Sequence, residues 1–324
     1  MDNIKGNNLI QKFKQFRMSG IFIVFILIIV IASIASPYFL TVYNLQSVIR
    51  SLAFVSIVAI GQACLLILGE IDLSVGAIAG LSGVLGGIMM VNASMNPYIA
   101  FVLSLLLGAG FGFINGFLVT TFNLNALVVT VGMTGVYQGI NLVISKGKAI
   151  IGIPKEIYFL GQGTFFNIPM PFIIMLITLV IIVFITKFTI FGRYMYAIGN
   201  SKEASEILGI RVKRVRIATF MITGLLAALA GMLMVARLGS SQPSIGESWV
   251  MDSIASSVIG GVALTGGVGS PAGALLGAAI IAIVNNIIVL FGVSPYWQTA
   301  VSGAIVVAAV IIDSISRMVS KSGN

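Results

Sequence analysis

Gly-Glu-Ile-Asp-Leu-Ser-Val-Gly, residues 69–76, places two carboxylates between two long apolar runs, residues 51–68 and 73–91. A charged side chain at the centre of a bilayer costs roughly 2.5–3.5 kcal/mol on insertion scales, so a chain that keeps Glu70 and Asp72 there usually has a use for them. The flanking glycines allow a turn or a helix break at little steric cost. The octet therefore predicts an interrupted helix, and we expect a functional or gating role for its carboxylates rather than simple helix capping.

The composition is that of an integral membrane protein. Of the 324 residues, 58% are hydrophobic and 8% are charged, whereas soluble domains carry about a quarter charged residues. Many separate apolar runs approach the ~20 residues that cross a hydrocarbon core of ~30 Å. The sequence predicts an all-α polytopic membrane protein. About ten transmembrane helices are expected, at residues 20–35, 51–68, 73–91, 98–121, 126–144, 171–186, 217–237, 253–264, 272–291 and 296–313.

The basic residues gather in the loops between these spans. The net charge of +9 would suit nucleic acid, but no nucleic-acid partner is expected, because basic residues beside membrane spans set their orientation. With the amino terminus inside, thirteen of the 18 Lys and Arg residues lie in inside loops. We expect residues 1–19 to be a cytosolic tail, residues 20–316 to form the membrane domain, and both termini to be cytosolic. For residues 20–35, a cleaved signal peptide is the alternative.

The residue inventory argues against chemistry performed by this chain. It contains no His, and its single cysteine, Cys64, lies in an apolar run, so neither a disulfide nor a His/Cys metal site is expected. No Gly-x-x-x-x-Gly-Lys-Ser/Thr loop is present to cradle the phosphates of ATP. We therefore expect no catalytic residue, no metal and no cofactor here, with ATP and Mg²⁺ held by a partner.

The interruption at residues 69–76 has a counterpart 170 positions later. Residues 239–246 read Gly-Ser-Ser-Gln-Pro-Ser-Ile-Gly, and both terminal glycines and the serine coincide with those of the first octet. Asn115 and Asn285 pair at the same offset. Corresponding spans of the two halves are five predicted spans apart. Because five is an odd number, corresponding spans cross the membrane in opposite directions and the halves must be inverted. Inverted repeats with broken helices are a recurring plan of transporters.

The two inverted repeats, about residues 51–145 and 217–313, would enclose a solute path at their interface. The two asparagines either face that path or bond a neighbouring helix, a contact worth about 0.6 kcal/mol. The candidate path or gating residues are Glu70, Asp72, Ser74, Asn115, Gln242, Ser244 and Asn285. Weaker candidates for contact with a neutral solute, each more often a packing residue, are Gln62, Tyr137, Gln138, Asn141, Trp297 and Gln298.

Small residues predict where helices approach closely. Gly108, Gly112 and Gly116 lie on one face of the span at 98–121, and Gly273 and Gly277 repeat the spacing near residue 272. Such faces let helix backbones pack tightly in lipid. We expect these glycines to serve packing.

Residues 188–216 form the one long loop expected on the cytosolic side. Asn200 is a good N-cap, Glu203 three residues later could complete a capping box, and Gly209 is a natural left-handed stop. This pattern predicts a two-turn helix outside the membrane. Because so short a helix is unstable alone in water, we expect it to dock on its own bundle or on a second protein.

Several stretches together resemble one known family. They are residues 69–76, 192–199 (Gly-Arg-Tyr-Met-Tyr-Ala-Ile-Gly), 203–210, 236–243 and 260–270. The sequence resembles the permease subunit of bacterial ATP-binding-cassette (ABC) importers for ribose and related simple sugars, over essentially the whole chain. One departure is Glu70, where family members often carry an uncharged residue, and this leaves the identity of the substrate open.

The resemblance implies a multi-pass protein of the bacterial cytoplasmic (inner) membrane. It implies a second permease subunit in a homo- or heterodimer, two ABC ATPase subunits inside and an extracytoplasmic sugar-binding protein outside, with membrane lipid around the bundle. It also implies that residues 203–209 are the coupling helix seated in an ATPase groove. The coupling residues would be Asn200, Glu203, Ala204 and Gly209.

Two other classes of function stay open on the sequence. An ion-coupled secondary carrier would suit the inverted repeat, with Glu70 or Asp72 carrying protons, but the lack of His weighs against it. The other is a membrane-embedded enzyme, for which the sequence offers no His/Asp/Ser constellation of catalytic residues. Within the importer class, the cargo could instead be a nucleoside or the sugar-like autoinducer.

Overall fold

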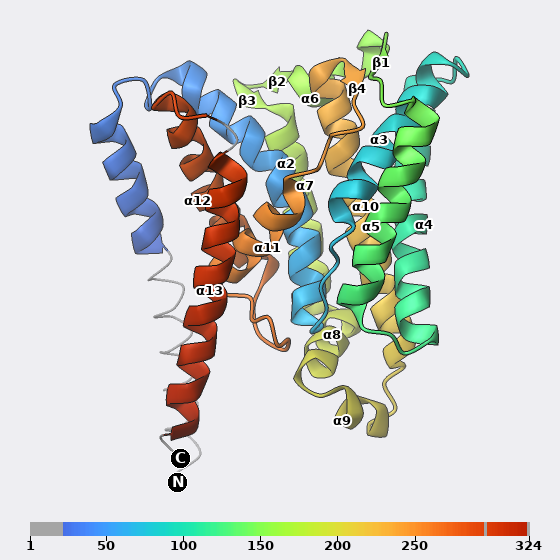
Figure 1. The fold of residues 1–324 in the computed structure, drawn as a ribbon, viewed down its shortest axis with the longest axis vertical. Helices are drawn as coiled ribbons and strands as arrows, with labels where there is room; N and C mark the ends of the chain where they lie inside the picture. The colour runs from blue at the N-terminus through green and yellow to red at the C-terminus, as the bar shows by residue number, and fades with distance from the viewer. Residues whose placement is uncertain (1–21, 295–296, 323–324) are drawn as a thin grey trace.

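The computed structural model describes residues 22–294 and 297–322; the predicted tail at residues 1–19 lies outside them. The chain forms a bundle whose main helices run along its longest axis (Figure 1). Within the described ranges, six helices are long and apolar enough to cross a membrane. They are α2 (Val42–Ile67), α4 (Pro97–Thr121), α5 (Ala126–Ser145), α7 (Met170–Phe188), α10 (Val212–Leu238) and α12 (Pro271–Leu290).

Shorter apolar helices fill the remaining predicted spans. They are Phe22–Ala35, α3 (Val75–Val91), α11 (Trp249–Ile259) and the Trp297–Ala308 part of α13 (Trp297–Ser322). An α-helix rises 1.5 Å per residue, so the 11 residues of α11 span about 16 Å, roughly half of a hydrocarbon core. The span predicted at residues 253–264 is therefore wrong in its bounds. The all-α polytopic membrane fold is confirmed.

Two long helices begin well before their predicted starts. α2 begins at Val42 instead of residue 51, because the Thr41 side chain accepts a hydrogen bond from the Asn44 N–H (3.4 Å) and caps the helix. Arg50, predicted to lie in a loop, is thus helical. α10 begins at Val212 instead of residue 217, and so takes in the basic residues predicted to end the cytosolic loop.

α2 and α10 pack side by side and run in opposite directions (Figure 1). Each is followed by an extended segment that turns back into the bundle before a shorter helix. We call residues 68–74, which precede α3, the first interruption, and residues 239–248, which precede α11, the second interruption. Both turn at a glycine with positive φ, 84° at Gly69 and 64° at Gly239, a conformation that glycine adopts without steric cost.

The second interruption meets the first turn of α3, directly after the first interruption, at a pair of glycines. A Cβ atom on Gly76 would overlap the carbonyl oxygen of Gly246, and a Cβ on Gly246 would lie 2.5 Å from the carbonyl oxygen of Gly76. The backbones can therefore touch only because both residues lack a side chain. The two octets that stand out in the sequence are thus in direct contact inside the bundle.

The segment between α5 and α7 folds over one end of the bundle (Figure 1). β1 pairs antiparallel with β4 of the second interruption, and Ile157 is fully buried. The glycine of α6, Gly161, lies against the backbone of Arg237. This segment consists of β1 (Ile150–Ile151), η1 (Lys155–Ile157), α6 (Tyr158–Gln162), β2 (Thr164–Phe165) and β3 (Ile168–Pro169), and β4 is Ser240–Ser241.

The predicted small-residue faces are confirmed as packing surfaces. Gly108, Gly112 and Gly116 all face α10, and a Cβ on Gly112 would overlap the carbonyl oxygen of Phe220. On α12, the glycines at 273 and 277 lie in the same way against the backbone at the end of α11. Close backbone approach, rather than interlocking large side chains, joins these helix pairs.

Gly112→Ala should lower the melting temperature of the purified protein in detergent, because the added methyl group must push α4 away from α10. Gly110→Ala on the same helix is the matched control, since nothing lies within 4 Å of its Cβ position. Alanine is favoured over glycine in helices by about 1 kcal/mol, so the control should be neutral or stabilising. Equal destabilisation by both changes would contradict this account of the α4–α10 contact.

Candidate functional site

The first interruption is a buried extended peptide whose backbone is held by side chains. In the orientation that pairs both of its polar atoms, the Gln62 amide donates to the Asp72 carbonyl oxygen and accepts from the Asp72 N–H, each at 3.2 Å. The Leu73 N–H donates to Thr130 Oγ1 (3.1 Å), and the Leu73 carbonyl oxygen accepts from Thr134 Oγ1 (3.0 Å). Unpaired backbone groups in lipid cost several kcal/mol, so these three side chains allow a non-helical peptide here.

The Asp72 carboxylate is the centre of a buried polar cluster. Its Oδ1 accepts from the N–H (2.7 Å) and the hydroxyl (2.6 Å) of Ser74, and its Oδ2 accepts from Asn115 Nδ2 (3.1 Å). The Tyr137 hydroxyl donates to Asn115 Oδ1 (3.0 Å). Asp72, Ser74 and Asn115 have no exposed surface. Three of the predicted path residues are thus hydrogen-bonded to one another in the structure. A role for them in a solute path stays a prediction.

Glu70 reaches away from this cluster to Arg216 in the first turns of α10. Nε and Nη2 of Arg216 both donate to Glu70 Oε1, and the two side chains are 11% and 10% exposed. Glu70 Oε2 is buried and has no partner within the described chain. The sequence had placed Arg216 in a loop, so this pairing could not be foreseen. The ion pair attaches the first interruption to α10.

Arg216→Met should destabilise the protein strongly, because removing one member of a buried ion pair leaves an uncompensated charge, at a cost of about 3–5 kcal/mol. The double variant Glu70→Gln, Arg216→Met removes both charges and should recover much of the loss. Thermal unfolding in detergent of the two single variants and the double variant forms the required cycle. A double variant as unstable as the sum of the singles would show that the pair is not coupled.

The predicted cytosolic loop contains two helices, α8 (Ile190–Asn200) and α9 (Lys202–Ile207), at the end of the bundle where α13 also ends (Figure 1). We call this the α9 end. Gly209 stops α9 with φ of 78°, as predicted. The predicted N-cap is wrong by one residue: Ser201 Oγ accepts from the Ala204 N–H (3.1 Å), while Asn200 ends α8. Glu203 then falls one position early for a capping box and accepts from the Ser201 hydroxyl (3.3 Å).

α9 rests on the bundle by one face and leaves its apolar tip uncovered. Ser205 is buried, and Lys202 Nζ donates to Asn123 Oδ1 at the end of α4 (3.1 Å). Ile207 and Leu208 are 86% and 77% exposed. Large apolar side chains at such exposure, beside charged neighbours, are typical of a surface that another protein covers.

α8 connects the α9 end to the first interruption. A Cβ on Gly199 would overlap the carbonyl oxygen of Ile67, the last residue of α2, and this oxygen also accepts from the Gly267 N–H (2.8 Å). The Tyr196 hydroxyl donates to the Gly269 carbonyl oxygen (2.9 Å). Burial raises the pKa of Tyr196 to about 12. α8 is thus in direct backbone contact with the end of α2.

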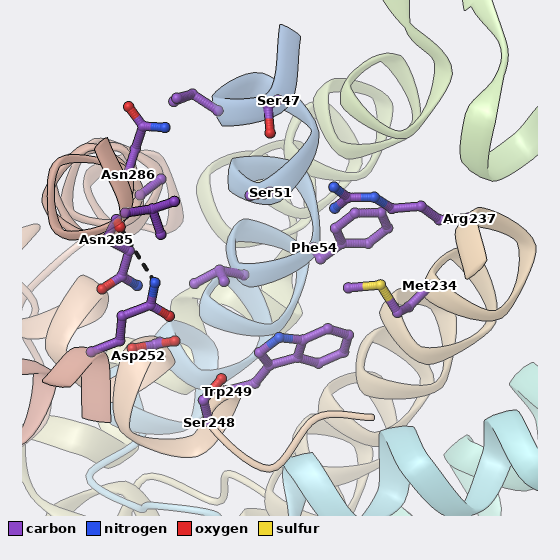
Figure 2. Close-up of a pocket in the computed structure, with 15 residues that line it drawn as sticks. Ser47, Ser51, Phe54, Met234, Arg237, Ser248, Trp249, Asp252, Asn285 and Asn286 are labelled. Carbon is purple, nitrogen blue, oxygen red and sulfur yellow. Dashed lines mark hydrogen bonds between the residues drawn. The ribbon is translucent and has the colours of Figure 1, made fainter. Parts of the chain in front are cut away.

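A pocket of about 260 Å³ lies between α2, α10, α11, α12 and α13, toward the opposite end of the bundle (Figure 2). On one side the Trp249 ring stacks parallel to Phe54, with centroids 6.4 Å apart. The guanidinium of Arg237 lies 5.4 Å from the centroid of the Phe54 ring. The structure thus gives this pocket an aromatic wall.

The other side of the pocket is polar. Asp252 is 5% exposed, and its Oδ1 accepts from the Ser302 hydroxyl (2.6 Å). Gln298 Nε2 donates to the Asn285 carbonyl oxygen (3.3 Å), and Asn285 Oδ1 is buried with no partner in the described residues. An unpartnered buried acceptor costs about 1–3 kcal/mol.

Comparison with known proteins assigns the chain to a family. Residues 44–310 match the family described as branched-chain amino acid transport system / permease component. The chain belongs to this permease family. Among curated proteins, the permease is 38% identical to the ribose import permease protein RbsC of Bacillus subtilis (strain 168) over 296 residues, 91% of this chain and 92% of that protein. No solved structure matches it.

Two further relatives of the permease differ in the cargo that they name. The D-allose transport system permease protein AlsC of Escherichia coli (strain K12) is 34% identical over 93% of this chain and 91% of its own. The autoinducer 2 import system permease protein LsrC of Photorhabdus luminescens is 34% identical over 88% of this chain and 86% of its own. The resemblance seen in the sequence is confirmed: the chain is a multi-pass membrane permease and not an enzyme.

The structure distributes the other predicted contact residues of the permease over several places. Asn285 and Gln298 line the pocket of Figure 2, whereas Trp297 is 60% exposed and does not. Gln138 and Asn141 line a smaller pocket of about 170 Å³ beside Gly246. Gln242 and Ser244 lie in the second interruption, where Gln242 Nε2 donates to Ser240 Oγ (3.4 Å) and Ser244 is exposed.

Sequence reasoning missed Phe54, Trp249 and Asp252, three pocket residues of the permease. The predicted span started at residue 253, so the first turn of α11 fell into a loop. Phe54 reads as ordinary packing within an apolar run. Asp252 did carry a signal, since a lone carboxylate beside apolar helix is as costly there as at position 72.

Proposed function

We propose that this permease is the membrane-spanning subunit of an ABC importer that carries a ribose-like sugar inward across the bacterial cytoplasmic membrane. The observation that carries the proposal is α9, a capped helix outside the long spans with an uncovered apolar tip at Ile207 and Leu208. In this proposal the tip sits in a groove of an ATPase subunit, with Glu203 and Ala204 in the helix, Gly209 ending it and Asn200 next to it at the end of α8.

Sugar is favoured as cargo by the relatives. The family description names branched-chain amino acids, but relatives at 38% and 33% identity over nine-tenths of this chain are named for ribose, and one at 34% is named for D-allose. The L-arabinose permease AraH of Azospirillum brasilense is 31% identical over 92% of this chain. A nucleoside or the autoinducer is the second cargo within the same class.

An ion-coupled carrier is not favoured. A proton-carrying carboxylate must lose and regain contact with water during transport. Glu70 is paired with Arg216, and Asp72 is fully buried among hydrogen-bond donors. Both carboxylates therefore hold the first interruption in place through an ion pair and hydrogen bonds. Gating would require these contacts to rearrange.

The proposal includes ten membrane helices in two inverted repeats. Support comes from the opposite directions of α2 and α10, each followed by an interruption (Figure 1), and from the contact between Gly76 and Gly246. The α9 end would face the cytosol, and both termini would be cytosolic, as the distribution of basic residues predicts. The opposite end, with the β1–β4 cap, would face the sugar-binding protein.

The partners in this proposal follow from the missing phosphate-binding loop and from the exposed apolar helix faces. ATP and Mg²⁺ would be bound by two ATPase subunits, because the sequence has no phosphate-binding loop. A second permease subunit, identical or homologous, would complete the assembly, and lipid would cover the apolar outer faces of helices such as α5 and α7, which are 17% and 28% buried.

Ile207→Ser with Leu208→Ser should release the ATPase from the purified importer and abolish uptake, because the apolar contact in the groove is lost. Ile151→Ser is the matched control, an isoleucine 77% exposed in the segment that caps the opposite end. The measurement is the amount of ATPase that co-purifies with each variant. Unchanged co-purification and uptake in the double variant would rule out coupling through α9.

Vesicles that contain the permease, its co-purifying ATPase and its binding protein should take up ribose only when ATP is present. A proton gradient without ATP is the control condition. Uptake driven by that gradient in the absence of ATPase would overturn the ABC assignment and favour the carrier.

A further inference from the structure

The pocket of Figure 2 has the size of a small solute. It holds about 260 Å³, which is below the roughly 300–1,000 Å³ of sites for drug-sized ligands. Its floor is the first turn of α11, which contributes Trp249 and Asp252, and α2 and α12 form its walls (Figure 2). A molecule of monosaccharide size fits this space.

The lining of the pocket divides into an apolar and a polar side. The stacked rings of Phe54 and Trp249 offer flat apolar surface, on which the C–H face of a sugar ring can rest. Asp252, Asn285 and Gln298 offer carboxylate and amide groups on the other side. Hydroxyl groups can both donate and accept, so a polyol satisfies a mixed set of acceptors and donors.

Two side chains of the pocket have hydrogen-bond acceptor capacity that the described chain does not use. Asn285 Oδ1 is buried and unpartnered in the described chain, and the Asp252 carboxylate keeps acceptor sites beyond the one that Ser302 occupies. Asn286, next to Asn285, is different: its amide is paired reciprocally with Asn44 at 3.0 and 2.7 Å. The neighbouring pair is complete, whereas Asn285 points its acceptor at nothing in the protein.

We propose that this pocket, through Trp249, Asp252 and Asn285, is a transient binding site for a neutral polyol of monosaccharide size. The inference rests on the proposed function and locates the solute within it. Because the pocket floor belongs to α11, which follows the second interruption, a shift of that interruption changes the site. Gly246 of this segment touches Gly76 in the first turn of α3, directly after the first interruption, so the segments that follow both interruptions lie close to the same pocket.

Cysteine labelling tests the site without ATP or partners. Cys64 is the single cysteine and is buried, so in a Cys64→Ala background the Ser51→Cys variant presents one pocket thiol and keeps all three proposed binding residues. We expect D-ribose, added at about ten times its dissociation constant, to slow labelling by a small methanethiosulfonate about tenfold. The Asn141→Cys variant is the matched control, because Asn141 lies in the smaller pocket.

Protection at position 51 alone supports the proposal. Equal protection at 51 and 141 overturns it, because a general closure of the bundle produces that result. Protection by leucine and not by ribose also overturns it, in favour of a zwitterion held between Asp252 and Arg237. No protection by either solute, while the wild-type importer shows ATP-driven ribose uptake, refutes the site and leaves the proposed function intact.

Transport by pocket variants gives a second, independent readout. Asp252→Asn and Asn285→Leu should each lower the ribose carried per ATP hydrolysed about tenfold, a change of about 1.4 kcal/mol in the coupled step. Stimulation of the ATPase by loaded binding protein should persist, which a misfolded permease would not allow. Thr178→Val on α7, a buried hydroxyl bonded only to its own helix (2.8 Å), is the control. Normal sugar-to-ATP ratios in both pocket variants would contradict the inference.

Discussion

The hydrogen bonding of the non-helical backbone inside the bundle is the constraint on which the rest of this structure depends. A helix pairs its own N–H and C=O groups, but an extended peptide surrounded by apolar helices cannot. Here side chains of α2 and α5 form hydrogen bonds with the backbone N–H and C=O groups of the first interruption, and Gln62 pairs with both groups of Asp72. Such an arrangement is specific to one register, so the interrupted peptide is held in one place without becoming helix.

The two interruptions differ in what surrounds them. The first is sealed by the Asp72 cluster, in which Asn115 has no exposed surface. The second leads into α11 and the pocket, where Asn285 has an acceptor without a partner. The two asparagines lie 170 positions apart, and one bonds a neighbouring helix while the other lines a cavity. The surroundings of the two interruptions therefore differ: one is a sealed hydrogen-bonded cluster and the other is a partly polar pocket.

Rigid contacts connect the α9 end to the pocket. The end of α8 lies on the last carbonyl of α2, the first interruption follows directly, and Gly76 then touches Gly246 beside the pocket floor. Each of these contacts is backbone to backbone, with no flexible side chain between to absorb a displacement. Close-packed elements of this kind move between discrete arrangements instead of deforming gradually. This chain of contacts offers a physical route by which movement at α9 changes the pocket.

The sequence by itself determined the membrane class, most helices, both glycine-bounded octets, the glycine faces of α4 and α12, and the stop of α9 at Gly209. These features follow from local hydrophobicity and from backbone conformations that only glycine adopts easily. Only the tertiary structure decided that Glu70 pairs with Arg216 and that Trp249 and Asp252 line a pocket. Those outcomes depend on which distant residues the packed helices bring together, and no local pattern encodes such proximity.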